Sequence, residues 1–320
     1  MTLILSDNDD QTTNLVIDWI DSAFVRLNSE NFIVGIQLEL NSDFITQEIC
    51  LFKDFVLDLS HIKSFWYRRD DFVLGINSDK IIIEKDLMKF NLEKEWHKLK
   101  DFLHVCCEYR NSIGSYRKEL LQNKLTCLSL AQKIGLQIPP TLVTTNKSDL
   151  LAFIQQQGEC ITKSIDSMFQ IKRPDFFQVI GTQIITDDLI DKLDDSFFPT
   201  LIQKRIEKVF ELRIFYLKGI FYSMAIFSQS DEKTSLDYRD YNREKPNRNV
   251  PYILPNDIEL KLKLLMDKLE LNTGSIDIMV TPENEYVFLE VNPTGQFGWL
   301  SQNCNYYLEE KIAHCLENAA

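Results

Sequence analysis

Two carboxylates and one amide lie on consecutive strand-like segments near the end of the sequence. Asp277 lies in the apolar run 275–280, Glu290 lies in the apolar run 286–291, and Asn292 follows directly. If residues 281 and 286 close a four-residue loop, the two runs form a hairpin that places Asp277 opposite Glu290. Asn292 lies two residues beyond Glu290 and therefore points to the same face.

Such a hairpin requires a counter-charge. Like charges directly opposite each other destabilise paired strands, and burying a charge among apolar side chains is costly. Asp277, Glu290 and Asn292 offer only oxygen donors, which suit Mg²⁺ shared with phosphate oxygens. The alternative is a half-exposed hairpin whose two acids face water. The polar, turn-forming segment 292–296 directly after an apolar strand favours the metal site.

Isolated cations in apolar strands indicate anion binding. Arg213 lies in the strand-like segment 211–217, and we expect it to bind a phosphate or acyl phosphate rather than a structural carboxylate. Glu211 shares its strand face and is either a ribose ligand or the partner of Lys208 or Arg213. Lys163, in the segment CITKSI, is either an edge residue or a phosphate ligand.

A second basic pair follows the bulky run FWY in the N-terminal part. Arg68 and Arg69 alternate faces, so only one of them is expected to point inward. Arg68 is therefore a candidate ligand for a substrate carboxylate, with a surface role as the alternative.

The pattern of elements predicts an α/β protein. Helices are expected at 12–24, 92–114, 116–134, 148–157 and 257–269. Strands are expected at 32–40, 46–51, 54–59, 63–68, 160–164, 177–184, 201–206, 211–217 and 220–227, with a tight hairpin at Lys218-Gly219.

Composition narrows the class of protein. The net charge of −13 over 320 residues argues against nucleic acid as the main partner. Seven cysteines without a CxxC pair favour free thiols in a reducing compartment. The sequence has neither a signal peptide nor an apolar run long enough for a membrane span, so we expect a cytoplasmic protein with no membrane partner.

The Asp, Glu-x-Asn pattern across two strands resembles the metal-binding signature of the ATP-grasp superfamily. Its longer form, SIDIMV at 275–280 and YVFLEVNPTGQFGWL at 286–300, is similar to the graspetide (microviridin-type) maturases, which cyclise ribosomally made precursor peptides. Further segments follow the family's order: FWYRR at 65–69, NKLTCLSLAQKIGLQIPPT at 123–141, IQKRIEKVFELRIFYLKG at 202–219, LDYRDYN at 236–242 and VPYILP at 250–255. LDYRDYN has Tyr where the family has Trp.

The resemblance implies a three-domain ATP-grasp fold with α+β subdomains and ATP between the central and C-terminal domains. The expected ranges are an N-terminal α/β domain at 1–115, a central domain with the leader-peptide site at 116–196, and a C-terminal domain with the metal site at 197–320. ATP and Mg²⁺ are the implied cofactors.

The resemblance also implies residue roles. Asp277, Glu290 and Asn292 would bind the metal, and Arg213, Arg239 and Lys163 would stabilise the transferring phosphate. The ATP ligands would be Lys124, Lys163, Gln203, Lys204, Ile206, Glu211 and Arg213. The peptide ligands would be Arg68 together with Lys172, Arg173, Asp187 and Asp188 in the leader-binding region.

The implied activity is ATP-dependent macrocyclisation. An Asp or Glu side chain of the precursor would become an acyl phosphate, and a Ser or Thr hydroxyl would attack it to form an ω-ester, which is favoured slightly over an amide from Lys. The resemblance also implies a leader-plus-core peptide partner and a homodimer. Two alternatives stay open: a ligase that joins a free amino acid to a peptide or small molecule, and a catalytically dead peptide-binding scaffold. The charged residues present make the scaffold the weaker one.

Overall fold

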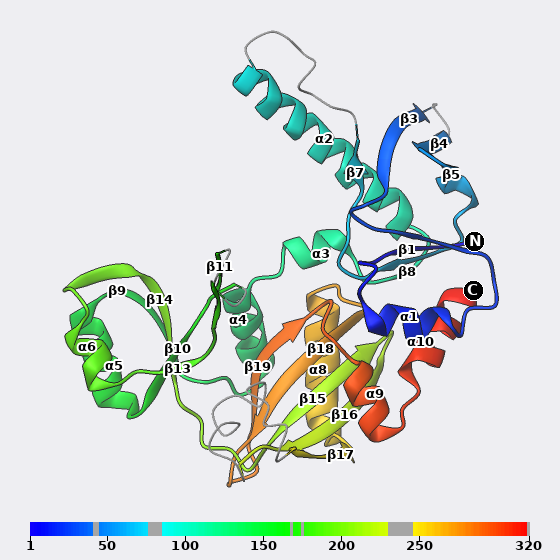
Figure 1. The fold of residues 1–320 in the computed structure, drawn as a ribbon. Coiled ribbons are helices and arrows are strands. Elements are labelled where there is room, and N and C mark those ends of the chain that lie inside the picture. Colours follow the sequence, from blue (N-terminus) through cyan, green and yellow to red (C-terminus); the bar gives the residue numbers. More distant parts are fainter. Residues whose placement is uncertain (41–44, 76–84, 167–168, 174–175, 230–245, 319–320) are drawn as a thin grey trace. The chain divides into compact units, whose positions relative to one another are not determined.

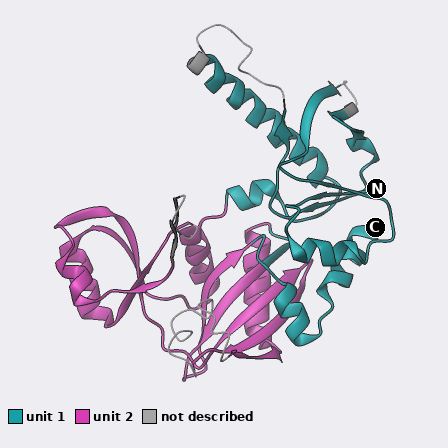
Figure 2. Cartoon of the chain, in the orientation of Figure 1, with its two compact units in different colours: residues 1–121, 271–274, 293–320 teal, residues 122–270, 275–292 magenta. Residues whose placement is uncertain are grey.

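The computed structural model describes residues 1–40, 45–75, 85–166, 169–173, 176–229 and 246–318 (Figure 1). The chain packs as two compact units (Figure 2). Unit 1 comprises residues 1–121, 271–274 and 293–320, and unit 2 comprises residues 122–270 and 275–292. Each unit therefore joins segments that are distant in the sequence. The three domain ranges expected from the sequence remain a prediction.

A parallel sheet forms the centre of unit 1. Its strand order is β2 (Phe24–Leu27), β1 (Thr2–Leu5), β6 (Ser64–Tyr67) and β8 (Asn111–Ile113). Every residue of β1 and β6 is buried, as central parallel strands require. Because β1 and β6 are parallel, the residues that follow them lie at one edge of the sheet.

Helices and a second sheet complete unit 1. Helix α1 (Gln11–Ile17) packs against α10 (Leu308–Glu317), and α2 (Lys85–Glu108) packs against β6, β8 and α3 (Tyr116–Leu120). The second sheet has the order β5 (Val56–Asp58), β4 (Ile45–Phe52), β3 (Phe32–Leu40) and β7 (Val73–Leu74). Side chains of both sheets, such as Leu3, Cys50 and Phe65, share one core cluster.

Three of the expected helices differ from the structure. The helix expected over 92–114 spans residues 85–108 instead, because residues 111–113 pair with β6 and form β8. The helix expected over 12–24 ends at Ile17, because Phe24 pairs with Thr2 and begins β2. The helix expected over 116–134 is divided into α3 and α4 (Lys124–Ile134). The Asn123 side chain accepts hydrogen bonds from the backbone N–H groups of residues 125 and 126, and this N-cap starts the second helix.

The first part of unit 2 is a four-stranded sheet. Its order is β13 (Gln183–Ile184), β10 (Cys160–Lys163), β14 (Ser196–Lys204) and β9 (Thr141–Asn146). Helix α5 (Lys147–Gln157) packs on β9 and β14, and α6 (Asp187–Asp191) follows β13. Strands β11 (Phe169–Arg173) and β12 (Phe176–Ile180) form a separate hairpin, so the strand expected over 177–184 is divided between β12 and β13.

The second part of unit 2 is a five-stranded sheet. Its order is β17 (Arg248–Tyr252), β16 (Ile220–Phe227), β15 (Phe210–Leu217), β18 (Thr273–Val280) and β19 (Tyr286–Asn292). The hairpin at Lys218-Gly219 is confirmed, since Leu217 pairs with Ile220. Helix α8 (Asn256–Lys268) and β19 both pack against α4. Among the described residues, no helix has the length and apolar character of a membrane span.

Gly114 provides a test of the packing at the end of β8. It has φ 74°, and a Cβ atom there would lie 2.6 Å from the carbonyl oxygen of Tyr67. Gly219 has φ 96° but no atom within 4 Å of the same position. We expect Gly219→Ala to cost about 1 kcal/mol from backbone strain alone, and Gly114→Ala at least about 2 kcal/mol more, typical of a forced steric conflict. Urea unfolding of the two variants measures the difference, and equal costs would contradict the close approach.

Candidate active site

The β18–β19 hairpin carries the predicted carboxylate pair. Asp277 pairs with Glu290, and Ser275 pairs with Asn292. The turn itself differs from the expected one, because Val280 and Tyr286 close the ladder. A bulge between Asp277 and Ile278 adds one residue to β19 and restores the register. The pairing of Asp277 with Glu290 is therefore confirmed, although the loop that leads to it is different.

The neighbouring strand supplies a cation to Asp277. Nη1 of Arg213, on β15, lies 2.9 Å from Oδ1 and 3.0 Å from Oδ2 of Asp277. Both side chains are buried. Arg213 therefore has a carboxylate partner, which is the alternative that the sequence left open. A phosphate role for Arg213 remains a proposal.

The start of α4 supplies a cation to Glu290. Nζ of Lys124 lies 3.5 Å from Oε2 of Glu290 and donates to the carbonyl oxygen of Ser164 at 2.8 Å. Ser164 directly follows Lys163, the half-buried last residue of β10. The structure thus brings Lys124, Glu290 and the end of β10 to one place, as expected if the two lysines serve one ligand.

The candidate adenine-binding segment lies at the end of β14. Gln203 is buried and donates through Nε2 to Oγ1 of Thr141 at 2.9 Å. Within the described part of the chain, its buried Oε1 accepts no hydrogen bond. An unsatisfied buried acceptor is costly, and an amino group of a base would satisfy it. Lys204 is exposed and uses its backbone N–H on the carbonyl of Pro140, and Ile206 is half-buried beyond the strand.

Glu211, the candidate ribose ligand, is also buried. It accepts a hydrogen bond from Nζ of Lys208 at 2.6 Å and one from Oγ of Ser228 at 3.1 Å. Pairing with Lys208 was one of the alternatives left open by the sequence, and it is the arrangement that the structure has. The ribose role remains a proposal.

The predicted peptide ligands of unit 2 occupy two elements. Lys172 and Arg173 end β11, where they pair with Phe177 and Phe176 of β12. Asp187 and Asp188 are exposed in the first turn of α6, and Asp188 forms an ion pair with Lys192 at 2.5 Å. A carboxylate in the first turn of a helix is also favoured by the helix dipole. Arg239 and the segment 236–242 lie outside the described residues.

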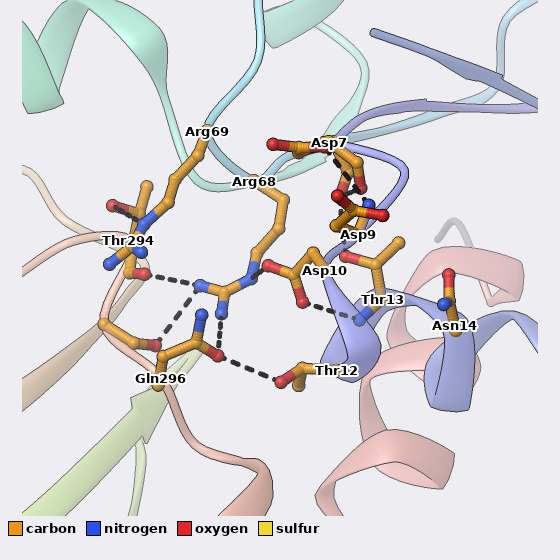
Figure 3. Close-up of polar contacts among 12 residues, drawn as sticks. Asp7, Asp9, Asp10, Thr12, Thr13, Asn14, Arg68, Arg69, Thr294 and Gln296 are labelled. Carbon is orange, nitrogen blue, oxygen red and sulfur yellow. Dashed lines mark hydrogen bonds and ion pairs between the residues drawn. The ribbon is translucent and has the colours of Figure 1, made fainter. Parts of the chain in front are cut away.

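Arg68 belongs to unit 1 and is the inward-pointing member of its pair. Its guanidinium contacts the carbonyl oxygen of Thr294 at 2.5 Å, Oε1 of Gln296 at 2.8 Å and Oδ2 of Asp10 at 3.2 Å (Figure 3). All of these partners belong to the chain itself. A substrate role for Arg68 remains a prediction that these contacts do not support.

Three partners of Arg68 were missed from the sequence. Thr294 and Gln296 lie in the polar segment already recognised after β19. Asp10 is the N-cap of α1, and its carboxylate accepts from the backbone N–H of Thr13 at 3.0 Å. An Asp directly before a helix was a visible capping signal, but its pairing with a residue after β6 depends on the parallel sheet.

Comparisons with known proteins complete the description. Neither a protein-family model nor a curated protein sequence matches the chain. Solved structures do match. A RiPP-associated ATP-grasp ligase of Chryseobacterium gregarium, in complex with ADP and a leader and core peptide, is 27% identical with a TM-score of 0.81, over 98% of this chain and 94% of that one. Macrocyclase MdnC of Microcystis aeruginosa MRC, bound with precursor peptide MdnA, is 29% identical with a TM-score of 0.79, over 100% of both chains. Macrocyclase MdnB of the same organism is 23% identical with a TM-score of 0.73, over 99% of both chains.

The chain is an ATP-grasp ligase. At 27% and 29% identity over nearly the whole chain, its similarity to the first two structures supports the resemblance to the graspetide maturases. The expected ATP-grasp fold is therefore confirmed.

The charges of this ATP-grasp ligase indicate how it would bind a metal. Asp277, Glu290 and Asn292 provide a set of oxygen donors that fits Mg²⁺. Each of the two carboxylates already faces a protein cation, Arg213 or Lys124. Mg²⁺ alone would add positive charge to a compensated pair, whereas Mg²⁺ with a polyphosphate brings its own negative charge. The site therefore fits the metal–nucleotide complex better than the bare ion.

Thermal unfolding can test this preference. Mg²⁺ alone should leave the melting temperature nearly unchanged, whereas ATP at about 100 times its Kd with Mg²⁺ should stabilise the fold by about 3 kcal/mol. Asp277→Asn should lose most of this stabilisation. Glu283→Gln, an exposed change in the loop of the same hairpin, is the matched control. Equal stabilisation by Mg²⁺ with and without nucleotide would contradict the charge argument.

Proposed function

We propose that the chain is an ADP-forming ligase that closes macrocycles in a ribosomally made precursor peptide. The observation that carries the proposal is a pair of neighbouring ion pairs, Arg213–Asp277 and Lys124–Glu290, whose carboxylates lie opposite each other on the β18–β19 hairpin. This set occurs in a chain whose full length matches ligases solved with ADP and with leader and core or precursor peptides. In this proposal an Asp or Glu side chain of the peptide is activated as an acyl phosphate, and a Ser or Thr hydroxyl attacks its carbonyl carbon with loss of phosphate.

The residues of unit 2 divide this work. ATP would supply the phosphoryl group, and Mg²⁺ would supply positive charge that stabilises the phosphate oxygens. Asp277, Glu290 and Asn292 would hold the metal, and the buried Oε1 of Gln203 would orient the base. Lys124, Lys163 and Arg213 would neutralise phosphate charge, because phosphoryl transfer depends on positioning and electrostatic stabilisation more than on a protein nucleophile.

Water must be kept from the activated carboxyl group. The contacts of Arg213 and Asp277 are buried, so charge on the transferring group would be stabilised in a region of low dielectric constant. The leader peptide is proposed to contact two elements of unit 2. These are the end of β11, with Lys172 and Arg173, and the start of the short helix α6, with Asp187 and Asp188.

The finer assignments belong to the same proposal. Ester rings are favoured by the overall resemblance, and the buried free cysteines agree with a reducing cytoplasm. A homodimer is proposed on the resemblance alone. No observation favours the amino-acid ligase or the inactive scaffold.

Co-expression tests the function directly. The protein is produced with each short open reading frame beside its gene, and the intact mass of the peptide is recorded. We expect the loss of whole water molecules, one for each ring. Glu290→Gln should abolish the loss because it removes a metal ligand, whereas Glu283→Gln in the same hairpin should retain it. Mild base then distinguishes esters from amides.

An unchanged mass with every neighbouring peptide, from wild-type protein that binds ATP, would contradict macrocyclisation. In that case the ATP-grasp assignment would stand, and the search would move to the ligation of free amino acids.

A further inference from the structure

Arg69 has the same charge as its neighbour Arg68, but its burial, backbone conformation and partners are different. Both follow β6 at the edge where the parallel strands β1 and β6 end. Arg68 is buried and contacts Asp10, Thr294 and Gln296, whereas Arg69 is exposed. Arg69 also has φ 105°, a backbone conformation that favours glycine. Holding a residue with a Cβ in such a conformation is costly, and such strain is concentrated at functional sites.

The side chain of Arg69 is held in one orientation. Its Nε donates to Oγ1 of Thr294 at 3.1 Å (Figure 3). Thr294 in turn donates to Oε1 of Glu119 at 2.5 Å, and the hydroxyl of Tyr67 donates to the other carboxylate oxygen of Glu119. Burial, followed by the nearby Glu119 carboxylate, raises the pKa of Tyr67 above its usual value. Tyr67 therefore stays a neutral donor to the carboxylate of Glu119.

This arrangement leaves one side of the guanidinium open. In the part of the chain that the structure describes, neither Nη1 nor Nη2 of Arg69 has an acceptor. In Arg68, by contrast, the guanidinium nitrogens contact Asp10, Thr294 and Gln296. An ordinary surface arginine is mobile and has no need of a strained backbone. A strained, anchored arginine with its two terminal nitrogens exposed instead matches the planar, two-oxygen geometry of a carboxylate.

We propose that Nη1 and Nη2 of Arg69 bind a side-chain carboxylate of an Asp or Glu in the substrate peptide. This inference deepens the proposed function and rests on it. It moves the carboxylate-binding role expected for Arg68 to its neighbour, because Arg68 has no open nitrogen side. Arg69 is then a specificity-determining residue, and Tyr67, Glu119 and Thr294 are positioning residues that act through it.

Arg69→Gly provides the main test, because glycine suits the backbone at φ 105°. The variant should melt at the same temperature as the wild type or higher. Its kcat/KM for the peptide should fall roughly 10- to 100-fold, as the loss of a charge-assisted hydrogen-bonded pair predicts. The loss should lie mainly in KM for the peptide, with KM for ATP unchanged. A purely structural arginine would instead lose stability together with activity.

Two further variants sharpen the result. Arg69→Lys keeps the charge without the planar fork and should recover only part of the activity. Arg117→Ala, which removes another exposed arginine of unit 1, should behave as the wild type. An unchanged KM for the peptide in Arg69→Gly would overturn the proposal.

A C-terminally amidated precursor distinguishes the two sources of a peptide carboxylate. We expect amidation to leave the wild-type KM unchanged. A KM that rises on amidation in the wild type but not in Arg69→Gly would assign Arg69 to the peptide terminus and overturn the side-chain assignment.

A binding experiment separates failure of this inference from failure of the proposed function. N-acetyl-glutamate N-methylamide carries a side-chain carboxylate and no terminal charge, and its glutamine analogue carries no charge. In protein labelled with ¹⁵N-arginine, the glutamate probe should shift the Nε–H signal of Arg69, identified by its absence in Arg69→Lys, and the glutamine probe should not. This readout requires no turnover. No shift with the glutamate probe would overturn the inference even if the peptide is cyclised.

Discussion

Two carboxylates that face each other across the β18–β19 hairpin form the constraint on which unit 2 depends. Asp277 and Glu290 are tolerable in this position because each meets a cation from a different element, Arg213 of β15 or Lys124 of α4. Removing either cation would leave a carboxylate without its compensation in a poorly solvated place. The charges therefore tie together one hairpin, one neighbouring strand and one helix start.

The position of Lys124 follows from this constraint. Lys124 is the first residue of α4, and the Asn123 cap fixes where that helix begins. A continuous helix through 116–134 would place the lysine in the middle of a longer rod rather than at a helix start. The cap also lets Nζ of Lys124 reach the carbonyl of Ser164 as well as Glu290, so the four-stranded sheet and the carboxylate pair are linked through one ammonium group.

At the edge of the parallel sheet in unit 1, two adjacent arginines have different surroundings. Arg68 is buried and its charge is met internally by the carboxylate of Asp10 and by carbonyl oxygens. Arg69 is exposed and has a strained backbone conformation, with φ 105°. Adjacent residues of identical type thus differ in environment because successive side chains at a strand end point to different sides. In the proposed reaction, where positioning provides most of the catalysis, such a fixed exposed cation is of direct use.

The sequence by itself determined the local features of this protein. Alternation and turn residues indicated the hairpins at 218–219 and 281–285, and the Asp, Glu-x-Asn spacing gave the carboxylate pair. The tertiary structure decided which residues become partners of the charged side chains. The bulge that restores the register of Asp277, the pairing of Arg213 with a carboxylate and the choice between Arg68 and Arg69 all depend on residues distant in the chain. Periodicity and capping act over a few residues, whereas the partner of a buried charge is set by which strands become neighbours in the sheet, and that is a property of the whole fold.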